Sequence, residues 1–393
     1  QTINRTNSTH LSTIILIRPR KPIMFSELDT QMMQTALSLA CQGLYSTSPN
    51  PRVGCVIARG SQIVGQGFHL KAGEPHAEVH ALRQAGNLAE GASAYVTLEP
   101  CSHHGRTPPC ALALIEAGIK RVVCAMSDPN PLVAGKGFAL LEAAGISVSS
   151  GLLEVEAREL NRGFLSRIER KRPFVRLKCA ASLDGKTALS DGSSKWITGT
   201  EARADVQKLR AESCAVLTGI GTVLADDPLL NVRDFPTLRQ PTRIILDSRL
   251  RTPLYSKIIQ DSNSPTLIVT LNQNPADHAP FLAYPHVQIL ALNSATENLQ
   301  INLHELLEQL AIQGYGEILI EAGAELNAAF IRQNLIDEII LYQSPKILGA
   351  AARSLFALPE NNETLLQPPQ WHPTHCTVLG NDVKICLALI NNT

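Results

Sequence analysis

Hydrophobic positions follow helix and strand periods in turn along most of the first half of the chain. Leu28, Met32, Ala36 and Leu39 share one helical face after Glu27, so we expect a helix that ends near residue 43. Residues 53–58 and 62–67 are predicted strands joined by a turn at residue 60. The pattern then predicts a helix at 76–85, a strand at 94–98, a helix at 110–117, a strand at 121–125 and a helix ending near residue 145. Strands that alternate with helices indicate a layered α/β fold.

The second half continues in the same way and shows no repeat of the first. Predicted strands lie at 174–179, 214–218, 243–246, 266–270, 317–320 and 338–342, and predicted helices at 201–210, 303–312 and 324–332. Between the halves, five of the six residues from Arg167 to Arg172 are charged and Pro173 follows. Such a segment is typical of a solvated connection. We therefore expect two domains, at residues 27–171 and 172–393.

The two ends of the chain carry less information. Residues 1–26 contain no acidic residue and four Lys or Arg among many Ser, Thr and Asn. This composition predicts a disordered tail, and a transit peptide is the alternative. No run approaches the ~18 apolar residues of a membrane-spanning helix. The last ~40 residues give no pattern beyond general packing.

Charge and cysteine content limit the classes of function. Thirty-five basic residues balance thirty-five acidic ones, so no overall field attracts a polyanion, and nucleic acid is disfavoured as the main partner. Nine cysteines are too few for a disulfide scaffold, and Cys55, Cys124 and Cys214 lie in apolar runs that predict small buried side chains. An odd number of cysteines without a secretory signal indicates a reducing compartment. We expect a cytoplasmic protein.

The clearest chemical pattern is a set of metal ligands in the first half. His76 and Glu78 form an H-x-E motif, and Cys101 and Cys110 each follow a proline. Zinc deaminases carry H-x-E followed by P-C-x-x-C; here eight residues separate the two cysteines instead of two. One imidazole and two thiolates give zinc three protein ligands and leave its fourth position for water. The alternative is that His76 merely ends a helix and the cysteines only pack.

The proposed ligand set suits hydrolytic deamination. Zinc lowers the pKa of a bound water toward ~7. The Glu78 carboxylate, two residues after the histidine, can take the proton of that water and pass it to the leaving amine. His76 and Cys110 fall at predicted helix starts, where positive partial charge favours anionic groups. His69, His80, His103 and His104 are additional histidines, for which a substrate contact or a loop position is expected rather than a role as a fourth ligand.

At this point the sequence resembles a known family. Residues 48–54 (SPNPRVG), 73–80 (GEPHAEVH) and 97–110 (TLEPCSHHGRTPPC) are similar to the deaminase half of the RibD family, the bifunctional deaminase/reductases of riboflavin biosynthesis, in which a long loop between the cysteines is normal. The resemblance implies a cytidine-deaminase-like α/β/α domain with one zinc ion on His76, Cys101 and Cys110, and Glu78 as the proton shuttle. It implies a diaminopyrimidinone substrate with a ribosylamino 5-phosphate, contacted by Asn50, His103, His104 and Arg106.

The second half shows two features of its own. The predicted strand at 317–320 runs into a turn of small residues, 321–325, at a helix start, which is a possible anion cradle; such turns are also common as plain tight connections. Residues 218–228 place glycines after a strand but lack the full G-x-G-x-x-G, so a Rossmann fold is not supported. The residues of the second half alone do not identify its cofactor.

Resemblance to the RibD reductase half implies the fold, the cofactor and the contact residues of the second half. It rests on residues 178–186 (KCAASLDGK), 194–198 (SKWIT) and 225–228 (ADDP), and implies a dihydrofolate-reductase-like α/β domain that uses NADPH. By position, the implied NADPH contacts are Ala180, Trp196, Thr222, Asp226, Ser248, Gly323, Ala324, Glu325, Leu326, Asn327, Ala328 and Ala329. The implied substrate contacts are Ser194, Arg210, Leu230, Arg233 and Glu321. Arg210 and Arg233 are suited to hold a phosphate through forked donors.

Together these observations predict an enzyme that deaminates with zinc and then reduces with NADPH, without nucleic-acid or membrane partners. The resemblance to the family implies a homo-oligomer, a dimer or a tetramer. Two alternatives stay open. One is a nucleic-acid base deaminase with an accessory domain, against which the zero net charge argues. The other is a non-catalytic interaction protein, against which the intact Glu78 and complete ligand set argue.

Overall fold

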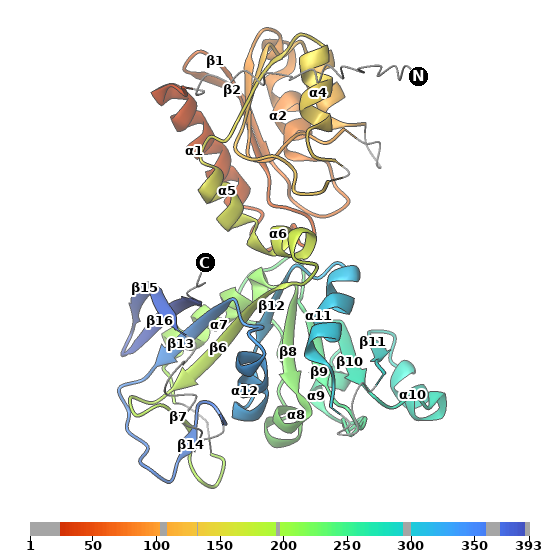
Figure 1. Ribbon diagram of the computed structural model, residues 1–393, viewed down its shortest axis with the longest axis vertical. Coiled ribbons are helices and arrows are strands. Elements are labelled where there is room, and N and C mark those ends of the chain that lie inside the picture. The colour runs from red at the N-terminus through yellow and green to blue at the C-terminus, as the bar shows by residue number, and fades with distance from the viewer. Residues whose placement is uncertain are drawn as a thin grey trace, which may run out of the picture.

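The structure is a computed structural model that describes residues 24–102, 108–131, 133–193, 197–293, 300–358 and 370–389. It contains two main sheets, one in each half (Figure 1). The first sheet has the strand order β2-β1-β3-β4-β5. Its strands are β1 (Gly54–Arg59), β2 (Gln62–Phe68), β3 (Ser93–Val96), β4 (Arg121–Cys124) and β5 (Ser147–Ser150). The pairs of β1 with β2 and with β3 are antiparallel, and the pairs beyond β3 are parallel.

Helices cover both faces of this sheet. The helices on one face are α1 (Glu27–Cys41), α5 (Glu154–Leu160) and α6 (Arg162–Glu169), and those on the other are α2 (Ala77–Ala85), α3 (Cys110–Glu116) and α4 (Lys136–Ala143); the 3-10 helix η1 (Gly86–Ala89) follows α2. Alternate residues of β1 divide between the two cores. Val56 packs with Met33, whereas Ile57 packs with Ala81. The expected three-layer α/β/α arrangement is confirmed.

Close approach of helices to the sheet explains two glycines of the first half. A Cβ atom at Gly54 would lie 1.9 Å from the carbonyl oxygen of Ala36 in α1, and one at Gly67 would lie 2.6 Å from that of Ala77 in α2. Any side chain there would push a helix off the sheet. The start of α1 is fixed by a capping box, in which Ser26 and Asp29 each accept the backbone N–H of the other.

The second sheet has the strand order β11-β10-β9-β8-β12-β6-β13-β16-β15. Pairs from β11 to β13 are parallel, and the hairpin of β15 and β16 adds antiparallel strands next to β13. Its strands are β6 (Phe174–Ala181), β8 (Ala215–Gly219), β9 (Thr242–Leu246), β10 (Thr266–Thr270), β11 (Val287–Ala291), β12 (Glu317–Ile320), β13 (Glu338–Gln343), β15 (Trp371–Leu379) and β16 (Asp382–Leu389). A small separate ladder joins β7 (Lys186–Ala188) and β14 (Arg353–Ser354).

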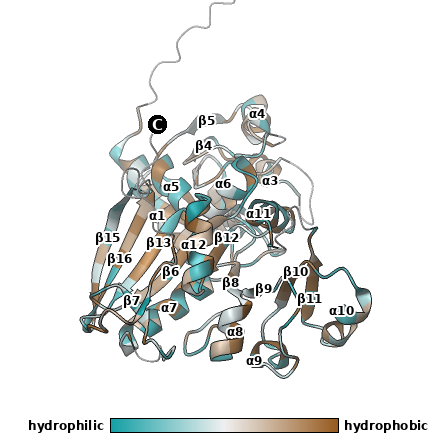
Figure 2. Ribbon diagram, turned by 60° about the horizontal axis from the view of Figure 1, so that its bottom comes forward, coloured by the Kyte–Doolittle hydropathy of each residue, from teal (hydrophilic) through white to brown (hydrophobic). Residues whose placement is uncertain are grey.

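Helices again form a layer on each side of the strands. Helices α11 (Leu303–Ile312) and α12 (Ala324–Arg332) pack on one face. The other face carries α7 (Thr200–Glu212), α8 (Ile220–Asp226), α9 (Lys257–Gln260) and α10 (Pro275–Leu282). Figure 2 shows the strands of this sheet mainly in the brown of hydrophobic residues, while the helices carry both colours. Across the part of the chain that the structure describes, no helix is both long and apolar enough to cross a membrane.

A buried network of charged side chains joins the two halves. Arg52, just before β1, pairs with Glu317 at the start of β12, with 3.2 Å between Nη2 and Oε2. Arg162 of α6 pairs with Glu317 and with Glu338. Although burial opposes ionisation, Arg52 and Arg162 hold the pKa of Glu317 at about 2. Helix α6 lies at this junction (Figure 1), and Gly163 packs directly on Gly316.

Two sequence-based expectations need correction. The segment from Arg167 to Arg172 is not a simple solvated connection, because residues 167–169 end α6 and both Arg170 and Arg172 pair with Asp337. Cys214 is not a plain packing residue: its sulfur accepts the backbone N–H groups of Gly316 and Glu317 and lies 2.7 Å from the hydroxyl of Ser48. Cys55 and Cys124 are buried as expected. Residues 1–23 of the predicted tail lie outside the described residues.

Candidate active sites

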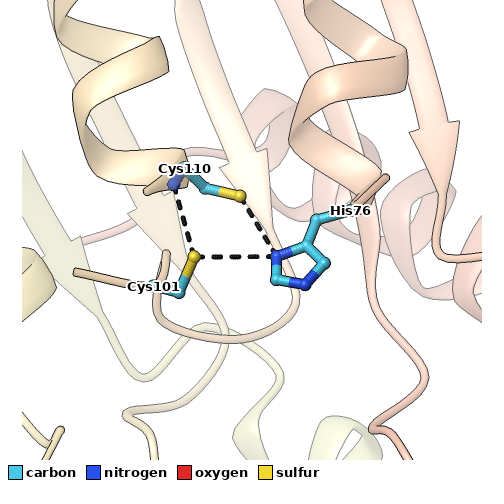
Figure 3. A group of neighbouring side chains, drawn as sticks. All are labelled: His76, Cys101 and Cys110. Carbon is cyan, nitrogen blue, oxygen red and sulfur yellow. Dashed lines mark hydrogen bonds between the residues drawn. The ribbon is translucent and has the colours of Figure 1, made fainter. Parts of the chain in front are cut away.

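Three predicted metal ligands converge at two helix starts of the first half. His76 is the N-cap of α2, Cys110 is the first residue of α3, and Cys101 lies in the loop after β3. His76 Nδ1 lies 3.3 Å from Cys110 Sγ and 3.6 Å from Cys101 Sγ (Figure 3). The backbone N–H of Cys110 points at Cys101 Sγ, at 3.3 Å. All three ligand atoms lie within 4.8 Å of one another.

These spacings fit a tetrahedral zinc site. Bonds of about 2.3 Å to sulfur and about 2.0 Å to nitrogen at tetrahedral angles put nitrogen and sulfur about 3.5 Å apart. The two observed nitrogen–sulfur distances lie on either side of that value. Among the described residues the set also has the composition of catalytic zinc sites, in which three protein ligands leave one position for a reactant. His76, Cys101 and Cys110 therefore fit the metal in both distance and chemistry.

The sulfur atoms are prepared for metal binding by their surroundings. The hydrogen bond with Cys110 lowers the pKa of Cys101 to about 4. That same bond, together with burial, raises the pKa of Cys110, and the contact with Cys101 raises the pKa of His76. Cys101 is thus the more readily ionised of the two thiols. Thiol ligands of zinc are deprotonated, so metal binding at these cysteines would release protons.

Glu78 lies in the first turn of α2 and is buried, with 3% of its surface exposed. Burial raises its pKa to about 7. Its carboxyl group lines the same cavity as His76 and Cys101. A carboxyl group with such a pKa can both accept and donate a proton near neutral pH, as general acid–base catalysis requires.

A cavity of about 610 Å³ opens beside these residues. Its volume is typical of a small-molecule site, roughly 300–1,000 Å³. Glu99, which follows β3, shapes one wall, since its carboxylate accepts the backbone N–H groups of Asp128, Gly135 and Gly137 at 2.9–3.1 Å. The sequence showed Glu99 only as a neighbour of Cys101, and nothing local reveals this bracing role.

The predicted ring contact Asn50 does line this cavity. Its Nδ2 lies 3.1 Å from Nε2 of His69, whose ring stands edge-on to His76 with centroids 5.3 Å apart. His69 was one of the additional histidines, and it also lines the cavity. The other predicted contacts of this site, His103, His104 and Arg106, lie outside the described residues.

The predicted cofactor contacts gather at one edge of the second sheet. Ala180 is near the carboxyl end of β6, Thr222 and Asp226 lie in α8 after β8, Ser248 follows β9, and Gly323 follows β12. These strands are neighbours in the parallel part of the sheet, so their carboxyl ends meet at one edge, where open α/β sheets bind ligands. The residues from Ala324 to Ala329 form the first turns of α12. Trp196 lies outside the described residues.

This edge has the free groups that a nucleotide needs. Thr218 in β8 and Asn327 in α12 each hold a buried side-chain oxygen that finds no hydrogen-bond partner within the described residues. Cβ atoms added at Gly221 and Gly323 would meet nothing within 4 Å. The open backbone at the start of α12 suits a phosphate, the Thr218 hydroxyl can donate to a ligand oxygen, and the Asn327 amide oxygen can accept from a ribose hydroxyl or a carboxamide N–H, so the edge fits NADPH. Thr218 was not among the predicted contacts.

The two arginines among the predicted substrate contacts of the second half differ in how far other side chains engage them. Arg210 directs Nε and Nη2 at the two carboxylate oxygens of Glu321, at 2.6 and 3.0 Å, and Nη1 at the carbonyl of Asn231. Arg233 is exposed, and its guanidinium contacts only the side chain of Asn231 within the described residues. Arg233 is thus the freer of the two predicted phosphate ligands. Leu230 is buried beside them with a φ of +50°, and Ser194 lies outside the described residues.

The fold and the site together define a zinc deaminase of the cytidine-deaminase type joined to a second α/β enzyme domain. Comparison with known families agrees. Residues 26–126 match the family described as the cytidine and deoxycytidylate deaminase zinc-binding region. Residues 173–385 match the family described as the RibD C-terminal domain.

Comparison with whole proteins identifies the family. The chain is 48% identical over 373 residues to the riboflavin biosynthesis protein RibD of Haemophilus influenzae, covering 92% of this chain and 97% of that protein. It is 47% identical to RibD of Escherichia coli, covering 92% and 99%. The solved structure of Acinetobacter baumannii RibD, form 1, superposes with a TM-score of 0.85 at 46% identity, covering 93% and 99%. The chain belongs to the RibD family.

It is therefore a bifunctional deaminase and reductase of riboflavin biosynthesis. Its deaminase half uses zinc and its dihydrofolate-reductase-like half uses NADPH. The family, fold and pair of activities expected from the sequence are confirmed. The roles of individual site residues and the exact domain limits stay predictions.

Proposed function

We propose that the first half hydrolyses the 2-amino group of 2,5-diamino-6-(5-phosphoribosylamino)pyrimidin-4-one. The second half then reduces the ribosyl side chain, giving 5-amino-6-(5-phosphoribitylamino)uracil. The observation that carries this proposal is that His76, Cys101 and buried Glu78 line one cavity, with the sulfur of Cys110 within 4.8 Å of the ligand atoms of His76 and Cys101. The solved diaminohydroxyphosphoribosylaminopyrimidine deaminase/5-amino-6-(5-phosphoribosylamino)uracil reductase of Thermotoga maritima is 33% identical to this chain and superposes with a TM-score of 0.81.

His76, Cys101 and Cys110 would hold the zinc ion. When bound, zinc supplies Lewis-acid activation of the attacking water. Glu78 accepts a proton from that water while the water oxygen forms a bond to C2 of the substrate. The carboxyl group donates this proton to the ring nitrogen and then carries the proton of the new C2 hydroxyl to the amine, so the C2–N bond breaks with one water consumed and one ammonia released. Burial of Glu78 suits this exchange, because it brings the pKa to about 7.

In the second half, bound NADPH would supply the hydride that reduces C1′ of the opened ribosylamine, and the nitrogen of that group would take a proton from solvent. Gly323 and the first turn of α12 would receive the phosphates of the cofactor. Arg233 would bind the 5-phosphate of the substrate, because it is exposed and carries no ion pair within the described residues. Glu321 fixes Arg210 through two hydrogen bonds, so Arg210 would orient the substrate from a rigid position.

We also propose the domain limits 27–171 and 172–393, a cytoplasmic location and a homodimer or homotetramer. The start of β6 at Phe174 and the family match from residue 173 support the boundary. The nine unbonded cysteines are in keeping with a reducing compartment. Size-exclusion chromatography with light scattering tests the oligomer, and a monomer at micromolar concentration would contradict it.

A two-stage assay tests the proposed activities and their order. Zinc-loaded protein is given the phosphoribosylated diaminopyrimidinone without NADPH, and ammonia is measured. NADPH is then added and its oxidation is followed. We expect one ammonia per substrate in the first stage and NADPH consumption only in the second. Absence of ammonia would contradict the deaminase proposal, whereas NADPH oxidation before any ammonia release would reverse the order.

A further inference from the structure

The charged segment between the two halves contains two kinds of basic residue. Arg170 and Arg172 both pair with Asp337, at 2.6 and 2.7 Å. Arg167 and Lys171, in contrast, form no ion pair with any residue that the structure describes. These are the two basic residues of the segment that line the 610 Å³ cavity beside the zinc ligands.

Arg167 is held in place without being neutralised. It comes from the last turn of α6, at the junction of the two halves (Figure 1). Its guanidinium carbon lies 5.9 Å from the centroid of the Phe164 ring. Its Nε is buried and has no hydrogen-bond partner in the part of the chain that the structure describes. An unpaired, partly buried guanidinium is costly unless a ligand supplies the missing acceptor.

Lys171 adds a second positive charge from the turn after α6. Its backbone has a φ of +58°, a conformation uncommon for a residue with a side chain. Its side chain is exposed at the cavity. Two cations from one short segment would attract a dianionic group more strongly than either alone.

The acidic groups of the cavity are on other elements. Glu78 is in α2, Glu99 follows β3 and Asp128 follows β4. Glu99 is occupied by three backbone N–H groups, and Asp128 accepts the backbone N–H of Asn130. In this cavity the proton-transfer and metal-binding groups thus come from α2 and the loop after β3. The positive charges without an ion pair among the described residues come from the end of α6 and the turn after it.

We infer that Arg167 and Lys171 bind the 5-phosphate of the deaminase substrate. A substrate whose reacting C2 faces the zinc ligands carries its phosphoribosyl arm on C6, away from the reacting amine. Arg167 provides forked donors suited to phosphate oxygens and Lys171 a mobile point charge. Both residues lie beyond the match to the cytidine deaminase zinc-binding region, which ends at residue 126. The connection between the halves is therefore a specificity element of the first active site.

This inference rests on the proposed deaminase function, and the experiment separates the two. Ammonia release is measured without NADPH for wild type, Arg167→Gln, Lys171→Gln and the double variant. Each is tested with the phosphorylated substrate and with its dephosphorylated riboside. Arg158→Gln is the matched control, since it removes one positive charge from nearby α5 at a residue that pairs with Glu169 and does not line the cavity.

We expect kcat/KM for the phosphorylated substrate to fall about 10- to 100-fold in each single variant, as loss of a charge-assisted hydrogen bond predicts. The values for the riboside should stay within about twofold of wild type. Ribose 5-phosphate should inhibit wild type competitively and the double variant much less. Arg167→Lys should recover part of the loss, and Arg158→Gln should behave as wild type.

Equal losses on both substrates, or no loss on either, would overturn the inference. Zinc content and thermal unfolding of each variant show whether the fold is intact, and the single variants decide the matter if the double variant does not fold. Failure of wild type to release ammonia from either substrate would instead contradict the proposed function itself.

Discussion

The two active sites of this chain are built in different ways. In the first half, three ligand atoms lie within 4.8 Å of one another at the starts of two helices and in one loop. In the second half, the predicted cofactor residues are spread over the carboxyl ends of four neighbouring strands, β6, β12, β8 and β9. A metal demands few ligands in strict geometry, whereas an extended nucleotide makes many separate contacts. A single substitution should therefore abolish the first activity but only weaken the second.

The largest expected effect is that of Glu78→Gln. The amide has a similar shape but cannot take the proton of the attacking water, so kcat for ammonia release should fall about 10³- to 10⁴-fold. NADPH oxidation with separately supplied deaminated intermediate should be unchanged. Parallel assays of the two steps measure this, and a comparable loss in both would show that the two sites are not independent.

The contact between the halves should respond to acid. Glu317 has a pKa of about 2 against its ordinary value of 4.5, chiefly because Arg52 and Arg162 outweigh the cost of burial. A lowered folded-state pKa gives stability that is present above pH 4.5 and is lost as the pH falls toward 2. The loss should be of the order of 3 kcal/mol.

Denaturant unfolding at several pH values between 2 and 7 measures this dependence. Glu317→Gln should be less stable than wild type at pH 7 and should have a flatter profile in the acid range. Glu159→Gln is the control, because its carboxylate pairs with the same Arg162 at the surface. If Glu159→Gln and Glu317→Gln flatten the profile equally, the buried pair is not its source.

A methyl group at Gly54 should lower the stability of the protein, because it disturbs the packing of α1 on the first sheet. Gly54→Ala places a methyl group 1.9 Å from the carbonyl oxygen of Ala36, so α1 must shift from the sheet. We expect a loss of about 1–3 kcal/mol, the usual cost of overpacking. Gly221→Ala is the control, because its Cβ would meet nothing within 4 Å. Thermal unfolding compares the two variants, and equal midpoints would contradict the close packing of α1.

The smallest expected effect is at the reductase site. Arg233→Gln removes an exposed cation that has no ion pair among the described residues, so KM for the reductase substrate should rise about tenfold. Ammonia release should not change, because Arg233 lies in the second half. Steady-state kinetics of both steps provide the measurement. An unchanged KM would remove Arg233 from the set of phosphate ligands.

Much of the fold could be predicted because local periodicity and burial agree. Helices α11 and α12 have the predicted bounds, and β1 and β2 differ by one residue at their ends. Prediction failed where tertiary contacts decide. Helix α6 ends within a charged segment whose arginines are paired with distant Asp337. In β15 most residues are exposed, so no apolar alternation marks the strand. Helix α10 contains Pro280, which conceals the helical pattern.

The same contrast between local pattern and tertiary contact applies to the site residues. His76, Glu78, Cys101 and Cys110 could be named from the sequence because metal chemistry restricts both residue type and spacing. Arg167 could not, since an arginine on a helix face gives no sign that its Nε is buried without a partner among the described residues. Likewise, Arg210 and Arg233 looked equivalent in the sequence, and only the structure shows that Glu321 occupies one of them.

The most direct test of the central claim is the zinc content of purified protein. Wild type and Cys101→Ala, each loaded with zinc and desalted, are compared by elemental analysis, with NADPH oxidation as the test of folding. Cys101 is suited to this test because it is less buried than Cys110. We predict one zinc per chain in wild type, none in Cys101→Ala, and equal reductase activity in both. One zinc retained per chain in Cys101→Ala would contradict a site formed by His76, Cys101 and Cys110.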